Sequence, residues 1–464
     1  MHSVDISFYL FSDSMKRLTF FTMLDIVVLL IWLIIIFGYA FYIRSKYSGL
    51  DYYKYYLPHL LFKVTFGFIF ALVYIFYYKG GDTIAYWDMA GCMNKLFSIS
   101  PEWYFQELFS DPSSPGYINH YNGETGYPPG WVMREHQGFF ISKIVSFFTF
   151  VTANSYLTIS LLFSVISARV SWRFYEMVKE IVPVSSKWFI YGVLFIPSVG
   201  FWCTGISKDA LVLISIFSII TNVFALLHRK AAYAWWNIIL ILVHMWILYN
   251  VRSVVLMTLF IPLFIAASLR LSNRFQEYIH FKRMVQFGIT VISITLFFLV
   301  IQSYGEEVSV EKYIKEAEIV QKDFTNNTAY TGKKYTLEVT DYSPLGMLQV
   351  FPAAVIAGWY RPFPWEALSP TLLLNGVESV ILLFLTFRFF LSGRKKRVRE
   401  IRKNEFLIFC FFFVIIFGFI MGFSSIIFGV LVRLRAPLLP FLMILFMVKP
   451  LDEETAETER LPKE

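Results

Sequence analysis

Runs of about 20 apolar residues recur along this 464-residue chain, and they constrain its fold more than any other feature. A run of that length crosses the hydrocarbon core of a bilayer as an α-helix, whose backbone groups are all hydrogen-bonded internally. The runs are continuous rather than alternating, which excludes a transmembrane β-barrel. Only 16% of the residues are charged, against about 25% in soluble domains. The sequence therefore predicts an all-α polytopic membrane protein.

The apolar runs predict about eleven transmembrane helices within a single integral membrane domain, residues 1–464. Residues 139–152 are also apolar, but counting them as a span would turn the later basic loops outward. They are therefore predicted to form an interfacial or re-entrant helix. The predicted spans are 20–43, 58–78, 154–172, 187–203, 209–227, 234–249, 252–269, 284–302, 371–391, 406–422 and 424–447.

Lysine and arginine in short loops predict the orientation of the chain, because such residues concentrate on the cytoplasmic side. The strongest signal is the run 394–403, which holds seven basic residues. With the N-terminus outside, this run and the basic loop 270–283 both lie inside, whereas Lys16 and Arg17 lie outside against the trend. The net charge of +8 comes largely from such loops, so no nucleic-acid binding is predicted.

This orientation places two large loops outside, 79–153 and 303–370. The first of them is predicted to contain a helix lying on the membrane surface at 101–110. The acidic tail, 449–464, is predicted to be disordered and cytoplasmic. Three short polar breaks between spans share the outer side: 205–210, 250–253 and 422–425.

The stretch GGDTIAYWD, residues 80–88, opens the first outer loop directly after a predicted span. Two glycines before Asp82 permit a tight turn. A carboxylate at this position could accept a proton from a sugar hydroxyl as a general base, so Asp82 is the candidate catalytic residue. The alternative is that Asp82 caps a helix beginning at Thr83, and the two roles are compatible.

Two of the short outer breaks carry isolated charges. The break GISKDA holds Lys208 and Asp209, and the break NVRS holds Arg252. Lys208 and Arg252 are candidates for binding a donor phosphate, with Asp209 orienting the lysine or acting as an acid. The alternative is that Lys208 and Asp209 form a solvated charge pair in a short turn.

Two arginines fall inside the last predicted span, in VLVRLRAPLLP. A guanidinium within the membrane costs several kcal/mol unless it is paired or lies in a wet cavity, so Arg433 and Arg435 mark a candidate ligand site. With Arg252 they could grip a pyrophosphate bidentately. The alternative is that they form structural ion pairs with acids such as Asp82 or Asp209.

A further charged pair, Arg361 and Glu366 in YRPFPWEALSP, leads into the span 371–391. These residues either add to the same site or anchor the loop at the membrane interface. No metal-ligand spacing, P-loop or GxGxxG motif is present, so neither a metal nor a cofactor is predicted. A lipid-linked donor presented from the membrane fits this chain better than a soluble nucleotide sugar.

The pattern resembles the bacterial envelope-polysaccharide glycosyltransferases of the GT-C type. The likeness lies in an acid in an early outer loop (Asp82), a following surface helix, many spans and a large late outer loop. The motifs FWCTGISKDAL, YNVRS, YRPFPWE and VRLRAPLLPFL also resemble membrane proteins from polysaccharide gene clusters of Bacteroidetes-like bacteria. RLRAPLLPFL is similar to the final-span motif of O-antigen-polymerase-like proteins.

The resemblance implies transfer of a sugar or glycan from a polyprenyl-phosphate or polyprenyl-pyrophosphate donor to a glycan acceptor. It also implies that a metal is often not needed. The expected location is the bacterial inner membrane, with the active face periplasmic. Two other functions stay open: a transporter or flippase for lipid-linked glycans, which should show repeated halves, and a non-enzymatic membrane scaffold.

Overall fold

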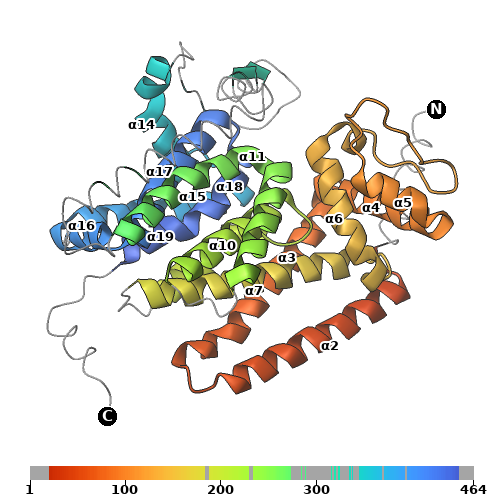
Figure 1. Cartoon of the computed structure of the whole chain (residues 1–464), viewed down its shortest axis with the longest axis horizontal. Helices are drawn as coiled ribbons and strands as arrows, with labels where there is room; N and C mark the ends of the chain where they lie inside the picture. Colours follow the sequence, from red (N-terminus) through yellow and green to blue (C-terminus); the bar gives the residue numbers. More distant parts are fainter. Residues whose placement is uncertain are drawn as a thin grey trace. The chain divides into compact units, whose positions relative to one another are not determined.

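The structure is a computed structural model of the whole chain (Figure 1). The structure describes residues 20–182, 188–228, 234–272, 344–367, 370–391 and 394–448, together with isolated positions between 284 and 337. The predicted span 284–302 lies almost wholly outside these residues, as do most of the loop 303–370 and the entire tail 449–464. The described part of the chain is helical and contains no strand beyond one isolated bridge, from Lys334 to Ile427.

Eight helices in the described residues are long and apolar enough to cross a membrane. The eight helices confirm the predicted class, an all-α membrane protein. They do not confirm the predicted number of eleven spans. These eight are Met23–Lys46 (α2), Asp51–Tyr77 (η1, α3 and η2), Tyr156–Ile181 (α7), Lys208–Leu227 (α10), Ala234–Ser272 (α11), Leu372–Leu391 (within α15, Pro370–Leu391), Glu405–Ser424 (α17) and Phe428–Met447 (α18, η6 and α19).

Two predicted spans differ from the structure for local reasons. The span 187–203 consists of two short helices, Phe189–Leu194 (α8) and Pro197–Trp202 (α9). Pro197 has no N–H to donate, so one helix ends before it and the next begins there. The last span is also divided: Phe428–Arg435 (α18) and Leu439–Met447 (α19) are joined by a 3₁₀ turn that contains Pro437.

The predicted break in NVRS coincides with a kink in Ala234–Ser272 (α11), where two helices meet. Arg270, near the end of this range, and His228, just before its start, both lie within 3.3 Å of Glu405, so the range does not run as one straight helix. The backbone leaves helical geometry at Arg252, with φ −157° and ψ 80°. The boundary predicted between 234–249 and 252–269 is therefore confirmed as a break between two helices at Arg252.

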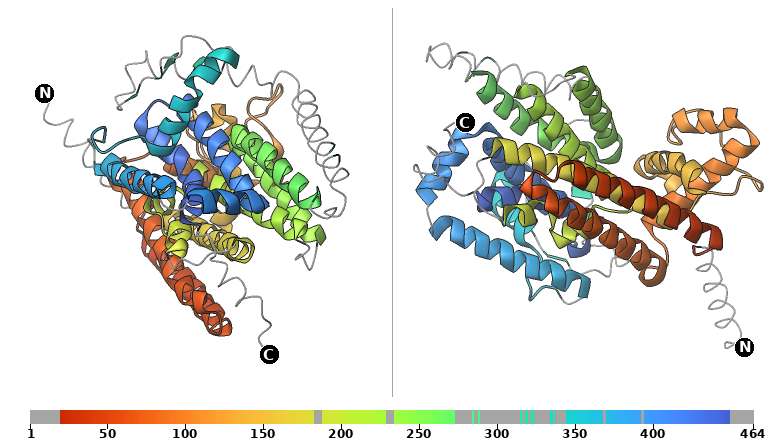
Figure 2. Two further views of the ribbon diagram at one scale, coloured as in Figure 1. Left: turned by 90° about the vertical axis from the view of Figure 1, so that its left-hand side faces the viewer. Right: turned by 90° about the horizontal axis from the view of Figure 1, so that it is seen from below.

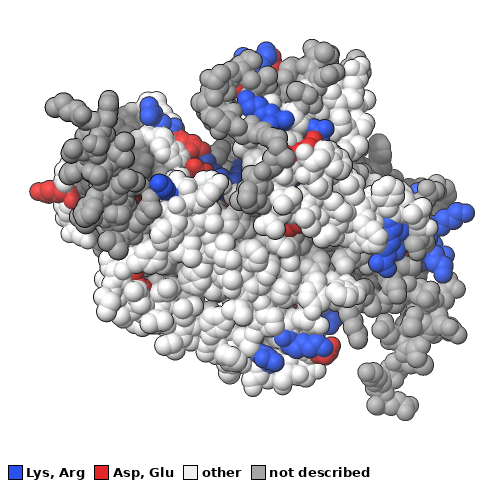
Figure 3. All heavy atoms as spheres, turned by 180° about the vertical axis from the view of Figure 1, so that it is seen from behind, with Lys and Arg blue, Asp and Glu red and all other residues white. Residues whose placement is uncertain are grey.

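The chain divides into two compact units. The first comprises Met1–Trp172, Val199–Phe217 and Trp246–Arg252, and the second comprises Arg173–Ser198, Ser218–Met245 and Ser253–Glu464. The division falls within α7, α10 and α11. Most described atoms on the face drawn in Figure 3 belong to uncharged residues, as expected for a chain with long apolar helices.

In the first unit, α2 runs beside α3, Tyr56–Leu72, and leaves most of its own surface uncovered (Figure 2). Leu30 and Ile34, for example, are 53% and 73% exposed, as expected for side chains that face lipid. The first outer loop folds into three packed helices, Asp82–Ile99 (α4), Pro101–Phe109 (α5) and His136–Thr152 (α6). The helices predicted at 101–110 and 139–152 are therefore present, as α5 and α6.

In the second unit, polar groups from four helix ends meet. Glu405, at the start of α17, lies 3.3 Å from Arg270 Nη1 and 3.2 Å from His228 Nε2. Asn404 donates to the carbonyl of Ile181, at the end of α7, over 2.8 Å. The ends that the sequence assigns to the cytoplasmic side thus contact one another.

Glycines bring Pro344–Tyr360 (α14) and α17 close enough for backbone contact, as small residues do between membrane helices. A Cβ on Gly422 would lie 1.9 Å from the carbonyl oxygen of Ala354. We expect Gly422→Ala to force α14 and α17 apart and to cost about 1–3 kcal/mol of stability, read as a lower midpoint of thermal unfolding in detergent. The control is Gly429→Ala in α18, where a Cβ meets nothing within 4 Å. Equal midpoints for the two variants would contradict this packing.

Candidate functional site

The turn before Asp82 has an unusual backbone. Three successive residues adopt positive φ: Lys79 (54°), Gly80 (145°) and Gly81 (100°). Only glycine populates such conformations readily, so the pair of glycines before Asp82 is what allows α4 to begin at this point. Gly81 is the residue that precedes the helix, and Asp82 is its first residue. The alternative, in which Asp82 caps a helix that starts at Thr83, is therefore wrong: Gly81 takes the cap position, and the helix starts at Asp82.

Lys208, the first residue of α10, is only 9% exposed. Its ammonium forms an ion pair with Glu135, and it donates to Gln137 Oε1 over 3.3 Å. The charges of Asp82 and Arg252 also act on this ammonium, so both residues lie within electrostatic reach of it. Glu135 immediately precedes α6, and its carboxylate is 39% exposed.

Asp209 is fully buried and pairs with Arg252, with Arg252 Nη2 lying 2.9 Å from Asp209 Oδ1. The interruption of α11 falls at this arginine. Lys208 and Asp209 thus bind different partners, and both are buried. The alternative of a solvated charge pair in a short turn is therefore wrong.

His136 links the first outer loop to α11. Its Nδ1 lies 2.6 Å from Asp111 Oδ2, and its Nε2 lies 3.0 Å from Asn250 Oδ1. The amide nitrogen of Asn250 donates to the carbonyl of Trp246, which leaves only the oxygen facing His136. Both ring nitrogens therefore lie within hydrogen-bond distance of an oxygen atom.

The environment of Asp111 agrees with an ionised carboxylate. Burial raises its pKa, but hydrogen bonds from Ser113 and the contact with His136 outweigh burial, so the pKa lies below 3.8. The outer cluster is defined by the groups that these contacts join. Its members are Asp82, Asp111, Glu135, His136, Gln137, Lys208, Asp209, Asn250 and Arg252.

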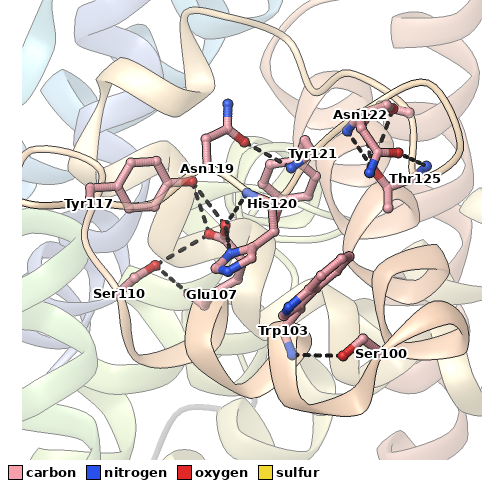
Figure 4. A network of polar contacts seen from close by, with 11 residues as sticks. Ser100, Trp103, Glu107, Ser110, Tyr117, Asn119, His120, Tyr121, Asn122 and Thr125 are labelled. Carbon is pink, nitrogen blue, oxygen red and sulfur yellow. Dashed lines mark hydrogen bonds and ion pairs between the residues drawn. The ribbon is translucent and has the colours of Figure 1, made fainter.

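A second polar network holds the loop beside this cluster (Figure 4). Glu107 of α5 is fully buried, and its carboxylate accepts hydrogen bonds from Tyr117, Ser110 and the backbone of His120. The ring of His120 lies 3.0 Å from the same carboxylate. Burial, and then the charge of Glu107, raises the pKa of Tyr117 far above its usual value. The rings of His120 and His136 therefore each contact a carboxylate, and His136 remains exposed.

The remaining predicted site residues belong to the second unit. Arg435 is fully buried, and its Nη1 donates to the carbonyls of Trp359 and Arg361 over 3.2 and 2.9 Å. No carboxylate lies within ion-pair distance of Arg435 among the described residues, and its Nε and Nη2 have no hydrogen-bond partner there. Arg361 pairs with Glu366 over 3.6 Å, and Arg433 is half-buried.

Sequence reasoning missed several charged residues within apolar helices. Lys63 in α3 is 1% exposed and donates to Ser167 and to the carbonyl of Val199. Glu378 in α15 accepts from the amide and the hydroxyl of Ser198 over 2.9 and 2.6 Å. A single charge inside an apolar run is the signal that could have identified both. Asp111, Gln137 and Asn250 had no such signal, because polar residues are common in loops.

The fold and the site define a class: a multi-pass, all-α membrane protein with a partly buried charge cluster, in which Lys208 and Asp209 are buried. No family model, curated protein or solved structure matches this chain. Among the described residues, no group of three or more His, Cys, Asp and Glu side chains is arranged to hold a metal ion. Any function therefore has to be argued from the outer cluster.

Proposed function

We propose that this protein is a membrane glycosyltransferase or polysaccharide polymerase. It transfers a sugar or glycan from a polyprenyl-phosphate or polyprenyl-pyrophosphate donor to a glycan acceptor at the outer face of the bacterial inner membrane. The observation that carries the proposal is that the half-buried carboxylate Asp82 belongs to the same unit as the buried cation Lys208 and the half-buried cation Arg252, and lies within electrostatic reach of Lys208. This combination suits a reaction that needs a base for a hydroxyl and cations for a phosphate.

In this mechanism Asp82 takes the proton of an acceptor hydroxyl, and the hydroxyl oxygen attacks the anomeric carbon of the donor. The bond from that carbon to the phosphate oxygen breaks, and the polyprenyl phosphate leaves with the bonding electrons. Lys208 and Arg252 stabilise the negative charge that develops on the leaving phosphate. The positive end of α10, at Lys208, adds to this stabilisation.

In the absence of donor, Glu135 forms an ion pair with the ammonium of Lys208. Because its carboxylate is 39% exposed, it can turn toward solvent when a phosphate takes its place on the ammonium. Asp209 stays with Arg252 and orients the guanidinium. The assignment of Arg361, Glu366, Arg433 and Arg435 to donor binding rests on their sequence positions alone.

The direct test uses the purified full-length protein in liposomes that contain a polyprenyl-pyrophosphate-linked oligosaccharide on the accessible face, with a soluble glycan acceptor outside. We expect a longer glycan and released polyprenyl pyrophosphate, both measured by mass spectrometry. Redistribution of the lipid-linked glycan between leaflets without a new glycosidic bond would refute the enzymatic proposal.

That second outcome would support a transporter for lipid-linked glycans, and one observation favours this alternative. The helix α11 is interrupted at Arg252, where the arginine pairs with the buried Asp209. Interrupted helices with buried charges are a feature of transporter substrate sites.

A further inference from the structure

A groove in the second unit shares no residue with the outer cluster and has a different chemistry. It has a volume of about 700 Å³ and is bounded by the α8–α9 segment, α15, α19 and Arg394–Lys403 (α16). Its walls are mostly apolar and include Tyr191, Leu382, Leu385, Met443 and Phe446. A volume of this size suits a small organic ligand, and walls of this kind suit a hydrocarbon chain.

The two ends of the groove carry opposite charges. Glu378 lies at one end, and both of its carboxylate oxygens are already bonded to Ser198. Arg388 lies ten residues further along α15, which is about 15 Å along the helix and about half the thickness of a bilayer core. The groove therefore has the length of one leaflet.

Among the described residues, the arginine end of the groove holds two guanidinium groups and no acid. Arg397 of α16 lines the groove, is 7% exposed and donates through Nη1 to the carbonyl of Arg388 over 3.2 Å. Its Nε is buried and has no hydrogen-bond partner among the described residues. Neither arginine has a carboxylate within ion-pair distance in the described part of the chain, since the nearby Glu400 pairs with Arg399 and Lys403. Burial and the charge of Arg388 lower the pKa of Arg397.

We propose that this groove binds an anionic phospholipid of the leaflet next to the basic helix α16, with an acyl chain along the apolar walls and the phosphate between Arg388 and Arg397. An anionic headgroup complements the charge of this end of the groove, because Arg388 and Arg397 both line it. One of these guanidinium groups also has a buried Nε without a hydrogen-bond partner among the described residues. Basic pockets at the ends of membrane helices bind anionic lipid headgroups for the same reason. Trp188 also lines the groove and is 69% exposed, which suits an aromatic residue at headgroup level.

The proposal is tested with the full-length protein in detergent by native mass spectrometry, titrating dioleoyl phosphatidylglycerol and, separately, dioleoyl phosphatidylcholine. We expect one tightly bound phosphatidylglycerol, and about tenfold weaker binding for phosphatidylcholine. Arg397→Gln and Arg388→Gln are each expected to weaken phosphatidylglycerol binding about tenfold, because each removes a charge-assisted hydrogen bond. Arg388 is exposed, so its variant is informative even where Arg397→Gln fails to fold.

The matched control is Arg402→Gln, which removes one exposed arginine from the same helix but not from the groove. Leu385→Trp fills the groove and is expected to abolish lipid binding while leaving the arginines in place. Glycerol phosphate, which has no acyl chain, is expected not to bind. Three outcomes would overturn the proposal: equal effects of the Arg402 and Arg397 variants, equal binding of the two phospholipids, or stronger binding of a polyprenyl phosphate than of phosphatidylglycerol at the same arginines.

Discussion

Replacing Asp82 by Asn is expected to lower glycan transfer by about 100- to 10,000-fold, the range that a positioned general base contributes. The amide keeps the size of the side chain but cannot accept the proton of an acceptor hydroxyl. Asp82 is the first residue of α4 and is half-buried, so the variant should fold, although it loses a favourable charge at a helix N-terminus. The measurement is the rate of product formation in the liposome assay, with the protein level checked by immunoblot.

The control is Asp88→Asn, which makes the same chemical change on an exposed residue of the same helix. It should leave transfer within about twofold of the unmodified protein, since surface substitutions usually have small effects. A Asp82→Asn variant that transfers at the normal rate would remove this residue from the catalytic role. Equal losses of transfer in both variants would show that transfer depends on the integrity of α4 rather than on the carboxylate of Asp82.

Replacing Arg252 by Met is expected to cost about 3–5 kcal/mol of stability, because it leaves the carboxylate of Asp209 buried without a counter-charge. Asp209 is fully buried, whereas the side chain of Arg252 is 17% exposed. The measurement is the free energy of unfolding in mixed detergent micelles. The control is Lys54→Met, because Lys54 and Asp51 lie at the same separation, 2.9 Å, but are 53% and 88% exposed. Breaking that exposed pair should cost less than about 1 kcal/mol.

The double variant Arg252→Met with Asp209→Asn separates the structural role of this pair from its functional role. Removing both charges takes away the uncompensated carboxylate, so most of the lost stability should return. Glycan transfer should stay low, because no guanidinium is left to stabilise the leaving phosphate. Recovery of both stability and transfer would show that the pair only holds α10 to α11.

The helices of this protein were predictable because bilayer crossing imposes a length and a composition that can be counted along the chain. The apolar runs at 20–43, 406–422 and 209–227 became α2, α17 and α10 with shifts of a few residues at their ends. Interruptions were harder to predict. The run 187–203 resembles one span by composition, but Pro197 divides it into two helices. Hydropathy did not predict this division, because it does not depend on the backbone N–H that proline lacks.

The candidate site was predictable only as a set of unusual charges. The sequence alone determined that Asp82, Lys208, Asp209 and Arg252 are isolated charges beside long apolar helices, because a charge there is costly and hence conspicuous. Tertiary structure alone decided their partners. Lys208 and Asp209 are neighbours in the chain, but successive helical residues point about 100° apart, so one reaches Glu135 of the first outer loop and the other reaches Arg252 of α11. Pairing between distant segments depends on how helices pack, and no local pattern encodes it.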